Sequence, residues 1–226
     1  MNGVWIRGLL DPGAAAEIVT SLESASFVDG RLTAQGAARA AKDNRQLSAE
    51  DALSRGLGAR LVSALTSSDA FRTLAMPRTL VPFTFSRYDP GMSYADHVDL
   101  PVMGTSIGPV RTDLSMTVFL SGPTDYDGGE LVIESDTSAR RTTIKGNPGD
   151  AWVYSASHVH RVEPVTRGRR YVALTWVQSL VADPEERELL ASFALALSAL
   201  ARDGVAESSL LRLRAVHHRL TRRWVR

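Results

Sequence analysis

The segment Tyr94 to Gly104, YADHVDLPVMG, contains the residues of this chain that are best suited to chemistry. His97 and Asp99 stand at positions i and i+2, in a chain with only five histidines. On a β-strand such residues point to the same face, so an imidazole and a carboxylate can bind one ion. This ligand pair suits divalent metals of borderline to hard character. Alone the pair is a weak signal, because His-x-Asp also occurs by chance on solvated strands.

A third metal ligand has to come from the remaining histidines. His217 and His218 lie in a basic tail beyond the strand-rich region, which makes them poor candidates. His158 and His160 lie in GDAWVYSASHVHRVEPV, where two predicted strands flank a short polar turn. These two share strand parity, so spacing alone leaves both open. Either one completes a set of two histidines and one carboxylate, which is typical of non-heme Fe(II) oxygenases.

Arg170 opens the apolar segment RYVALTWV. A guanidinium at the head of a buried strand requires an anionic partner, because an unpaired buried charge is costly. The partner is either a carboxylate of the protein, in a structural salt bridge, or the carboxylate of a small ligand held by two parallel hydrogen bonds. The position of Arg170 in the sequence is compatible with both.

A β-sheet core must position these residues. From Leu80 the chain consists of short segments rich in β-branched and aromatic residues, separated by turn signals such as Asp127-Gly128-Gly129 and Asn147-Pro148-Gly149. Many short strands without intervening helices predict an antiparallel sandwich, jelly roll or barrel.

Helical patterns flank this core. Asp11-Pro12 predicts a capped helix start, Ser48 is the predicted start of a second helix, and Asp183-Pro184 of a third. We therefore expect an N-terminal helical support region over residues 1–79, a β-sheet core over 80–180 and a C-terminal helical extension over 181–226.

The totals exclude several functions. The chain has 226 residues, a net charge of +1 and no cysteine, which excludes disulfides, thiolate metal sites and cysteine nucleophiles. No signal peptide or membrane-spanning run is recognisable, so we expect a cytoplasmic protein with no membrane partner. The arginine-rich end, LRLRAVHHRLTRRWVR, favours a solvated helix face over a nucleic-acid or acidic-partner patch, and the apolar helix before it is a candidate homodimer surface.

The order of the candidate residues is more specific than any one of them. His-x-Asp is followed by strands, then by a histidine, then by an arginine. In this order the chain resembles the Fe(II)/2-oxoglutarate-dependent dioxygenases, and among them the bacterial PKHD-type (prolyl/lysyl-hydroxylase-like) hydroxylases. The resemblance spans nearly the whole chain, through the segments FVDGRLTA, SRYDPGMSYADHVDLPVMG, VRTDLSMTVFLSGPTDYDGGELVIE and HRVEPVTRGRRYVALTWVQS.

The resemblance implies roles for five residues. Carried over by position, the iron ligands fall on His97, Asp99 and His160, and the 2-oxoglutarate-binding arginine on Arg170. Tyr88, in SRYDPG, is a looser match for a second contact to the cosubstrate.

The resemblance also implies a fold and a reaction. The fold is α+β and mainly β: a double-stranded β-helix (jelly roll) with flanking helices and with iron at its open end. The reaction is O2-dependent hydroxylation of an unactivated C–H bond in an unidentified peptide, amino acid or small metabolite, with succinate and CO2 as co-products. Ascorbate is implied as a reductant. One departure is the sequence SHVHRV, which carries His158 where the family usually has a single histidine.

A serine hydrolase is a competing interpretation. Residues 104–108 match the G-x-S-x-G nucleophile elbow around Ser106, and Asp127, Asp150 and His160 follow in triad order. The elbow needs a preceding strand and a following helix, whereas this segment continues into the predicted strand LSMTVFLS.

Two further interpretations keep the β fold. A cupin-like metalloprotein would normally carry histidine in place of Asp99 and would have no use for Arg170. A non-catalytic iron and 2-oxoglutarate sensor, or a partner-binding module, would keep all four residues, so sequence does not separate it from an enzyme.

Overall fold

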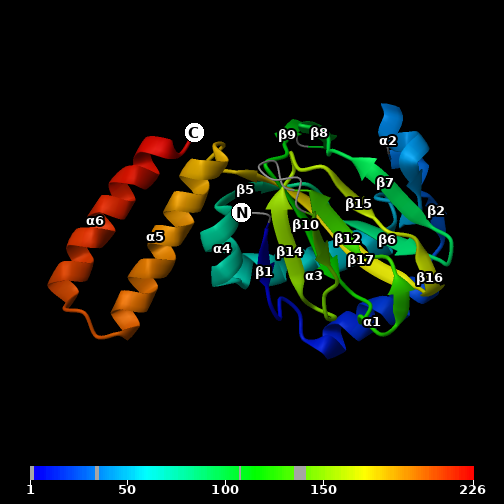
Figure 1. Cartoon of the computed structure of the whole chain (residues 1–226), viewed down its shortest axis with the longest axis horizontal. Helices are drawn as coiled ribbons and strands as arrows, with labels where there is room; N and C mark the ends of the chain where they lie inside the picture. The colour runs from blue at the N-terminus through cyan, green and yellow to red at the C-terminus, as the bar shows by residue number, and fades with distance from the viewer. Residues whose placement is uncertain (1–2, 34–35, 107, 135–140) are drawn as a thin grey trace.

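Two antiparallel sheets and six α-helices make up the computed structural model, which describes residues 3–33, 36–106, 108–134 and 141–226 (Figure 1). The larger sheet has the strand order β1-β14-β10-β17-β6-β4-β2, with β5 also paired to β17. Its strands are β1 (Val4–Ile6), β2 (Phe27–Asp29), β4 (Arg45–Leu47), β5 (Pro77–Leu80), β6 (Thr84–Tyr88), β10 (Leu114–Phe119), β14 (Ala151–Ser155) and β17 (Arg170–Ser179).

The smaller sheet has the order β13-β12-β15-β7-β3. Its strands are β3 (Lys42–Asp43), β7 (Ser93–His97), β12 (Leu131–Glu134), β13 (Arg141–Ile144) and β15 (His160–Val162). Two short ribbons complete the β structure, β8 (Val102–Thr105) with β9 (Gly108–Arg111) and β11 (Tyr126–Gly128) with β16 (Val165–Gly168). This architecture confirms the predicted jelly-roll core within an α+β fold.

The strand β10 shows why these segments form a sheet. All six of its residues, LSMTVF, are buried, because it lies inside the larger sheet between β14 and β17. On one face of that sheet, Phe119, Trp152 and Val172 pack against Leu131 and Ile133 of the smaller sheet. The space between the two sheets is therefore an apolar core at one end, and the site described below occupies the same space farther along.

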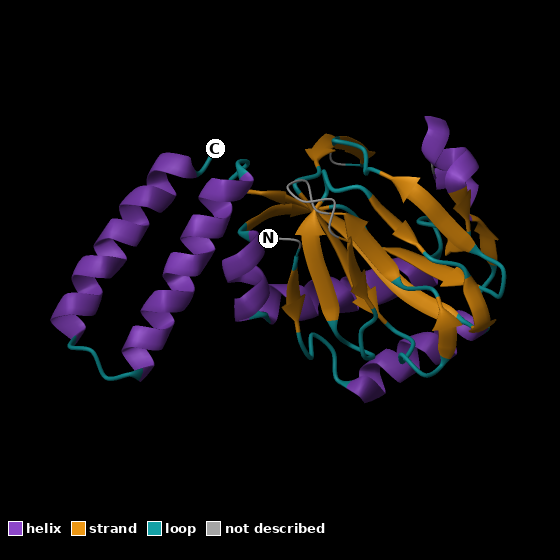
Figure 2. Ribbon diagram, viewed as in Figure 1, coloured by secondary structure: helices purple, strands orange, loops and turns teal. Residues whose placement is uncertain are grey.

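The six described helices are α1 (Pro12–Glu23), α2 (Gly36–Ala41), α3 (Ala52–Ser67), α4 (Asp69–Ala75), α5 (Pro184–Arg202) and α6 (Glu207–Trp224), with a 3₁₀ turn, η1, at Gly30–Thr33. Of these, α1, α3 and α4 cover the other face of the larger sheet (Figures 1 and 2). Ile18 of α1 and Leu61 of α3 share one buried cluster with Phe85, Met116 and other sheet residues. The helices thus support the strands that carry the site.

The predicted helix starts at Pro12 and Pro184 are confirmed, each with the preceding aspartate accepting hydrogen bonds from backbone N–H groups. The start expected at Ser48 was three residues early. Asp51 is the N-cap, accepting from Leu53 N at 2.7 Å, while Ser48 forms a turn with Glu50. The expectation of a helical first part was also incomplete, since this part supplies β1 to β4 as well.

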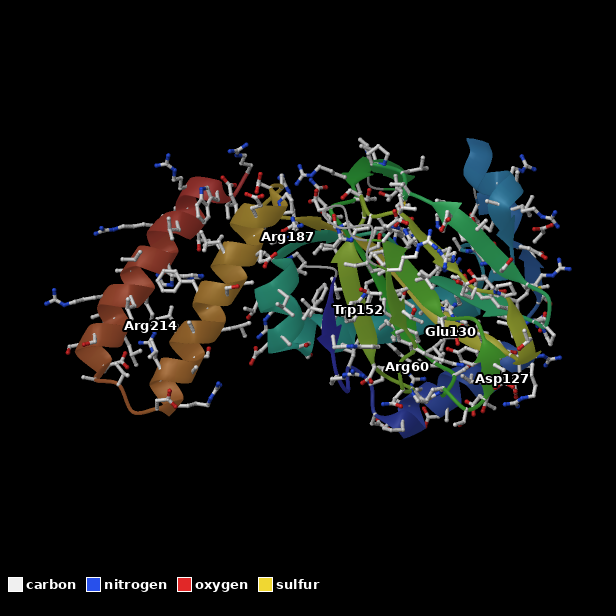
Figure 3. The ribbon with its side chains drawn as sticks, in the orientation of Figure 1. Arg60, Asp127, Glu130, Trp152, Arg187 and Arg214 are labelled. Carbon is white, nitrogen blue, oxygen red and sulfur yellow. The ribbon has the colours of Figure 1, made fainter. Side chains whose placement is uncertain are left out.

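The last two helices form a hairpin beside the β core (Figure 1). Arg187, labelled in Figure 3 where α5 meets the strands, is buried and donates to the Val181 carbonyl at 2.8 Å, while Arg214 lies on α6 away from them. Within the described residues, no helix combines the length and the apolar composition required to cross a membrane.

Candidate active site

Strand pairing brings three of the sequence-predicted residues together. Antiparallel pairing of β15 with β7 sets His160 opposite His97, and Asp99 follows two residues beyond. One ligand atom from each of the three lies within 4.8 Å of the others. The two imidazole centroids are 4.2 Å apart, and His160 Nε2 lies 3.9 Å from Asp99 Oδ2. These distances are short enough for one ion to contact all three side chains.

The structure separates His158 from this cluster. Residues 156–159 form the turn before β15 rather than part of the strand, so the parity argument does not apply to them. His158 lines a different cavity, between β14 and the start of α5. The remaining histidines are on α6, where His217 Nε2 lies 3.2 Å from the Leu190 carbonyl oxygen.

Backbone carbonyls orient both imidazoles. His97 Nδ1 lies 2.8 Å from the Ala95 carbonyl oxygen, and His160 Nδ1 lies 3.0 Å from that of His158. A carbonyl only accepts, so each Nδ1 carries the proton and each Nε2 presents its lone pair. Such outer contacts are usual for histidine ligands of metals.

Burial favours the neutral form of His97. The pKa of His97 is lowered well below its usual value, first by burial and then by the neighbouring His160. Neutral imidazole at neutral pH is the form that binds metals. Asp99 Oδ2 accepts a hydrogen bond from Ser115 Oγ on β10, which fixes the carboxylate toward the histidines.

Arg170 lies in the same cavity, which has a volume of about 470 Å³ and is lined by both sheets. The residue is 1% exposed, and none of the described residues offers a hydrogen-bond partner to its Nε. Among the described residues, no carboxylate lies within ion-pair distance (4.0 Å) of this guanidinium. A structural salt bridge therefore does not explain why Arg170 is buried there.

Two neighbours shape the arginine end of the cavity. Tyr88 pairs with Arg170 in register, and the guanidinium carbon lies 5.1 Å from the centroid of its ring. Burial raises the pKa of the Tyr88 hydroxyl, and the arginine charge offsets part of that rise. Gly129 passes close by, where a Cβ would lie 3.1 Å from Arg170 Cδ and its φ is +66°. Glycine is therefore required there, both for space and for backbone conformation.

Sequence reasoning missed several residues of this cavity. Ser115 was recognisable only as one of many residues on a predicted strand. Lys42, Asn44 and Gln46 also line the cavity, on an extended segment that runs from β3 into β4. No alternation marks them as strand residues, because Asp43 and Arg45 between them are polar as well, and the segment lies in a part of the chain that was expected to be helical.

The hydrolase interpretation is not supported. Ser106 is an exposed residue in the turn between β8 and β9, so the segment is a β-hairpin rather than a strand-to-helix elbow. Asp127 is paired with Arg167 instead, and Asp150 accepts from Arg7 at 2.6 Å.

Comparisons with known proteins agree with this geometry. The family model described as "2OG-Fe(II) oxygenase superfamily" matches residues 83–178, the segment with both β7 and β17. A PKHD-type hydroxylase of Bordetella pertussis is 41% identical over 224 residues, covering 98% of each chain.

Two solved structures share the fold. A Pseudomonas putida prolyl-4-hydroxylase has a TM-score of 0.54 at 15% identity, covering 79% of this chain and 92% of its own. A prolyl hydroxylase from Trichoplax adhaerens, solved with a hypoxia inducible factor peptide, has a TM-score of 0.55 at 15% identity, covering 83% and 86%. With the near full-length relatives at about 40% identity, the chain belongs to the PKHD-type hydroxylases of the 2OG-Fe(II) oxygenase superfamily and is a 2-oxoglutarate-dependent dioxygenase.

Proposed function

We propose that His97, Asp99 and His160 hold Fe(II), and that Arg170 binds the far carboxylate of 2-oxoglutarate, with Tyr88 as a second contact. The donor set fits the metal, because two neutral imidazole nitrogens and one carboxylate form the facial triad of non-heme Fe(II) oxygenases. The buried guanidinium, which has no carboxylate within 4.0 Å among the described residues, fits a carboxylate ligand.

The observation that carries the proposal is that both features share one cavity. The three candidate metal ligands lie on β15, at the end of β7 and just beyond it. The buried cation, Arg170, lies on β17 and lines the same space between the sheets. A cosubstrate with a chelating end and a free carboxylate end can contact both at once.

The proposed reaction is hydroxylation of an unactivated C–H bond of a peptide or small-molecule substrate with O2, yielding succinate and CO2. Bound iron supplies the oxygen chemistry, as cofactors do in such enzymes. The protein would orient the metal ligands through Ser115 and the Ala95 carbonyl. It would also bind the far carboxylate of the cosubstrate and limit the access of water to the cavity.

Binding measurements test the proposal without turnover. Under anaerobic conditions Fe(II) should bind at one site per chain. His97→Ala and Asp99→Ala should each abolish binding, while His158→Ala, the matched control in the adjacent turn, should not. Unchanged affinity in both of the first two variants would refute the metal site.

The cosubstrate role of Arg170 has its own test. Arg170→Met should weaken 2-oxoglutarate binding at least tenfold and leave Fe(II) affinity within a factor of about two. Equal loss of both would indicate that the arginine serves the fold instead.

A non-catalytic iron and 2-oxoglutarate sensor is the second candidate, since the same four residues would serve it. Succinate release from labelled 2-oxoglutarate, with a panel of peptides and small molecules, separates enzyme from sensor.

Four further expectations stay predictions. They are ascorbate as a reductant, a cytoplasmic location, a homodimer through the C-terminal helices, and the division of the chain at residues 79/80 and 180/181. Light scattering of the purified protein tests the dimer.

A further inference from the structure

A second buried cation lies in the cavity, and the proposed function does not use it. Lys42 is 7% exposed, and its Nζ donates to Thr33 Oγ1 at 2.9 Å. An ammonium has three N–H donors, and within the described residues this bond uses one of them. Among the described residues, no carboxylate lies within 4.0 Å of Nζ. A buried charge with so few partners is costly, so we expect an anion to bind beside it.

Lys42 lies at the metal end of the cavity, on a different sheet from Arg170. It pairs with Tyr94 across β3 and β7, and its Nζ is 5.4 Å from the centroid of the Tyr94 ring. The same ring stacks on the His97 imidazole, with centroids 3.5 Å apart. One aromatic ring therefore links the ammonium to the metal cluster.

Asn44 is a second buried polar group in this wall. It is 1% exposed, and among the described residues neither its Oδ1 nor its Nδ2 has a hydrogen-bond partner within 3.5 Å, although its side chain lies near the Tyr88 hydroxyl. The extended backbone places its side chain on the same side as that of Lys42. Gln46, the next residue in the alternation, is satisfied on both sides, by Thr33 at 2.6 Å and by Ser86 at 3.1 Å. Unsatisfied buried amides are rare, so Asn44 marks a place where a ligand atom can bind.

Exposed apolar residues line another part of the same cavity. Val98, Leu100 and Val102, which flank the metal ligand Asp99 in the chain, are 47%, 43% and 51% exposed and line the same cavity. Exposed apolar side chains along a cavity that also holds buried polar groups favour a ligand with an apolar body.

We propose that the substrate is a carboxylic acid with an aliphatic or aromatic body. Its carboxylate accepts from Lys42 Nζ and Asn44 Nδ2, and its body packs against Val98, Leu100 and Val102 above the metal. This inference rests on the proposed function, because the iron cluster and Arg170 account for the two ends of 2-oxoglutarate. The ammonium of Lys42 then remains for a different anion.

Probes that differ only in charge test the inference. N-acetyl-L-leucine and N-acetyl-L-phenylalanine, each compared with its primary amide, are titrated into the full chain loaded with Mn(II) and 2-oxoglutarate. Paramagnetic relaxation of the probe protons reports binding near the metal. We expect each acid to bind at least tenfold more tightly than its amide.

Variants connect that preference to Lys42. Lys42→Met should abolish the preference for acids, and Lys42→Arg should retain it. Lys145→Met is the matched control: it removes the chain's other lysine, which does not line the cavity and contacts Tyr126 and Glu130 instead. This control should keep the wild-type preference.

The outcomes are separable. No preference for acids in the wild-type chain, absence of any probe binding included, overturns the inference, as does a preference that survives Lys42→Met. If Lys42→Met weakens 2-oxoglutarate binding as much as Arg170→Met does, Lys42 serves the cosubstrate, and the inference is again overturned. A wild-type chain that binds neither Mn(II) nor 2-oxoglutarate contradicts the proposed function itself. Mn(II) binding by Lys42→Met shows that this variant is folded.

Discussion

Replacing Lys42 by methionine should stabilise the metal-free protein. Burial lowers the pKa of the Lys42 ammonium from 10.5 to about 8, although the charges of Asp99 and Asp29 act in the opposite direction. At about 1.4 kcal/mol per pKa unit, the protonated lysine costs the folded state about 3 kcal/mol relative to the unfolded chain. The lost hydrogen bond to Thr33 offsets about 1 kcal/mol of this. Lys42→Met should therefore raise the free energy of unfolding by about 2 kcal/mol at pH 7.

The direction of the Lys42 pKa shift determines how the stability difference between the two proteins changes with pH. The folded-state pKa lies below the unfolded one, so between pH 8 and 10.5 the unfolded chain binds the extra proton and wild-type stability rises with pH. The penalty is complete below pH 8 and absent above 10.5. The advantage of Lys42→Met should thus be largest near neutral pH and disappear by about pH 10.5.

Urea denaturation of the two metal-free proteins, followed by circular dichroism from pH 6.5 to 10.5, measures this difference. Lys145→Met is the control, and it should lose stability, because it gives up a 2.8 Å hydrogen bond to the Tyr126 carbonyl and an ion pair with Glu130. If Lys42→Met is destabilised at pH 7 as much as the control, or if its effect on stability does not change with pH, then burial of the protonated Lys42 does not destabilise the folded protein, and the reasoning is refuted.

Three further predictions concern the metal ligands and the discarded hydrolase. Ser115→Ala removes the hydrogen bond to Asp99. We expect the Fe(II) affinity, measured by anaerobic titration, to fall about 10–100-fold with little change in thermal stability. An unchanged affinity would show that Asp99 does not need this hydrogen bond. His160→Ala should abolish metal binding while His158→Ala leaves it intact, and the reverse result would transfer the third ligand to the turn. A fluorophosphonate should not label Ser106, and stoichiometric labelling would revive the hydrolase.

Much of the site could be predicted from local sequence. His97 and Asp99 stand at positions i and i+2, although β7 ends at His97 and Asp99 lies just beyond it. Arg170 opens an apolar segment whose burial follows from its composition. The core strands and two of the three helix starts were also local properties, since they depend on alternation, caps and proline. The helix start predicted at Ser48 was wrong because a competing cap, Asp51, lies three residues later, and the strands β1 to β4 in the first part of the chain were not predicted.

Other features depend on contacts between segments that are distant in the sequence. His158 and His160 have the same parity, and only the point at which β15 begins, opposite β7, determines which of them meets His97. Ser115 reaches Asp99 because β10 lies across the cavity from the end of β7. Such pairings depend on sheet register, which no local pattern specifies.

Lys42 shows the difference most clearly. By sequence it is a polar residue in AAKDNRQL, a segment without a chemical signature, and a solvated lysine would be the ordinary expectation. Pairing of β3 with β7 buries it beside Tyr94 instead, and in the part of the chain that the structure describes its ammonium has one hydrogen-bond acceptor. Composition and order determined a strand-rich core and the candidate residues, and the family resemblance supplied their iron and cosubstrate roles. Tertiary structure alone decided which polar groups are buried without partners, because burial is a property of the assembled sheets and not of any single segment.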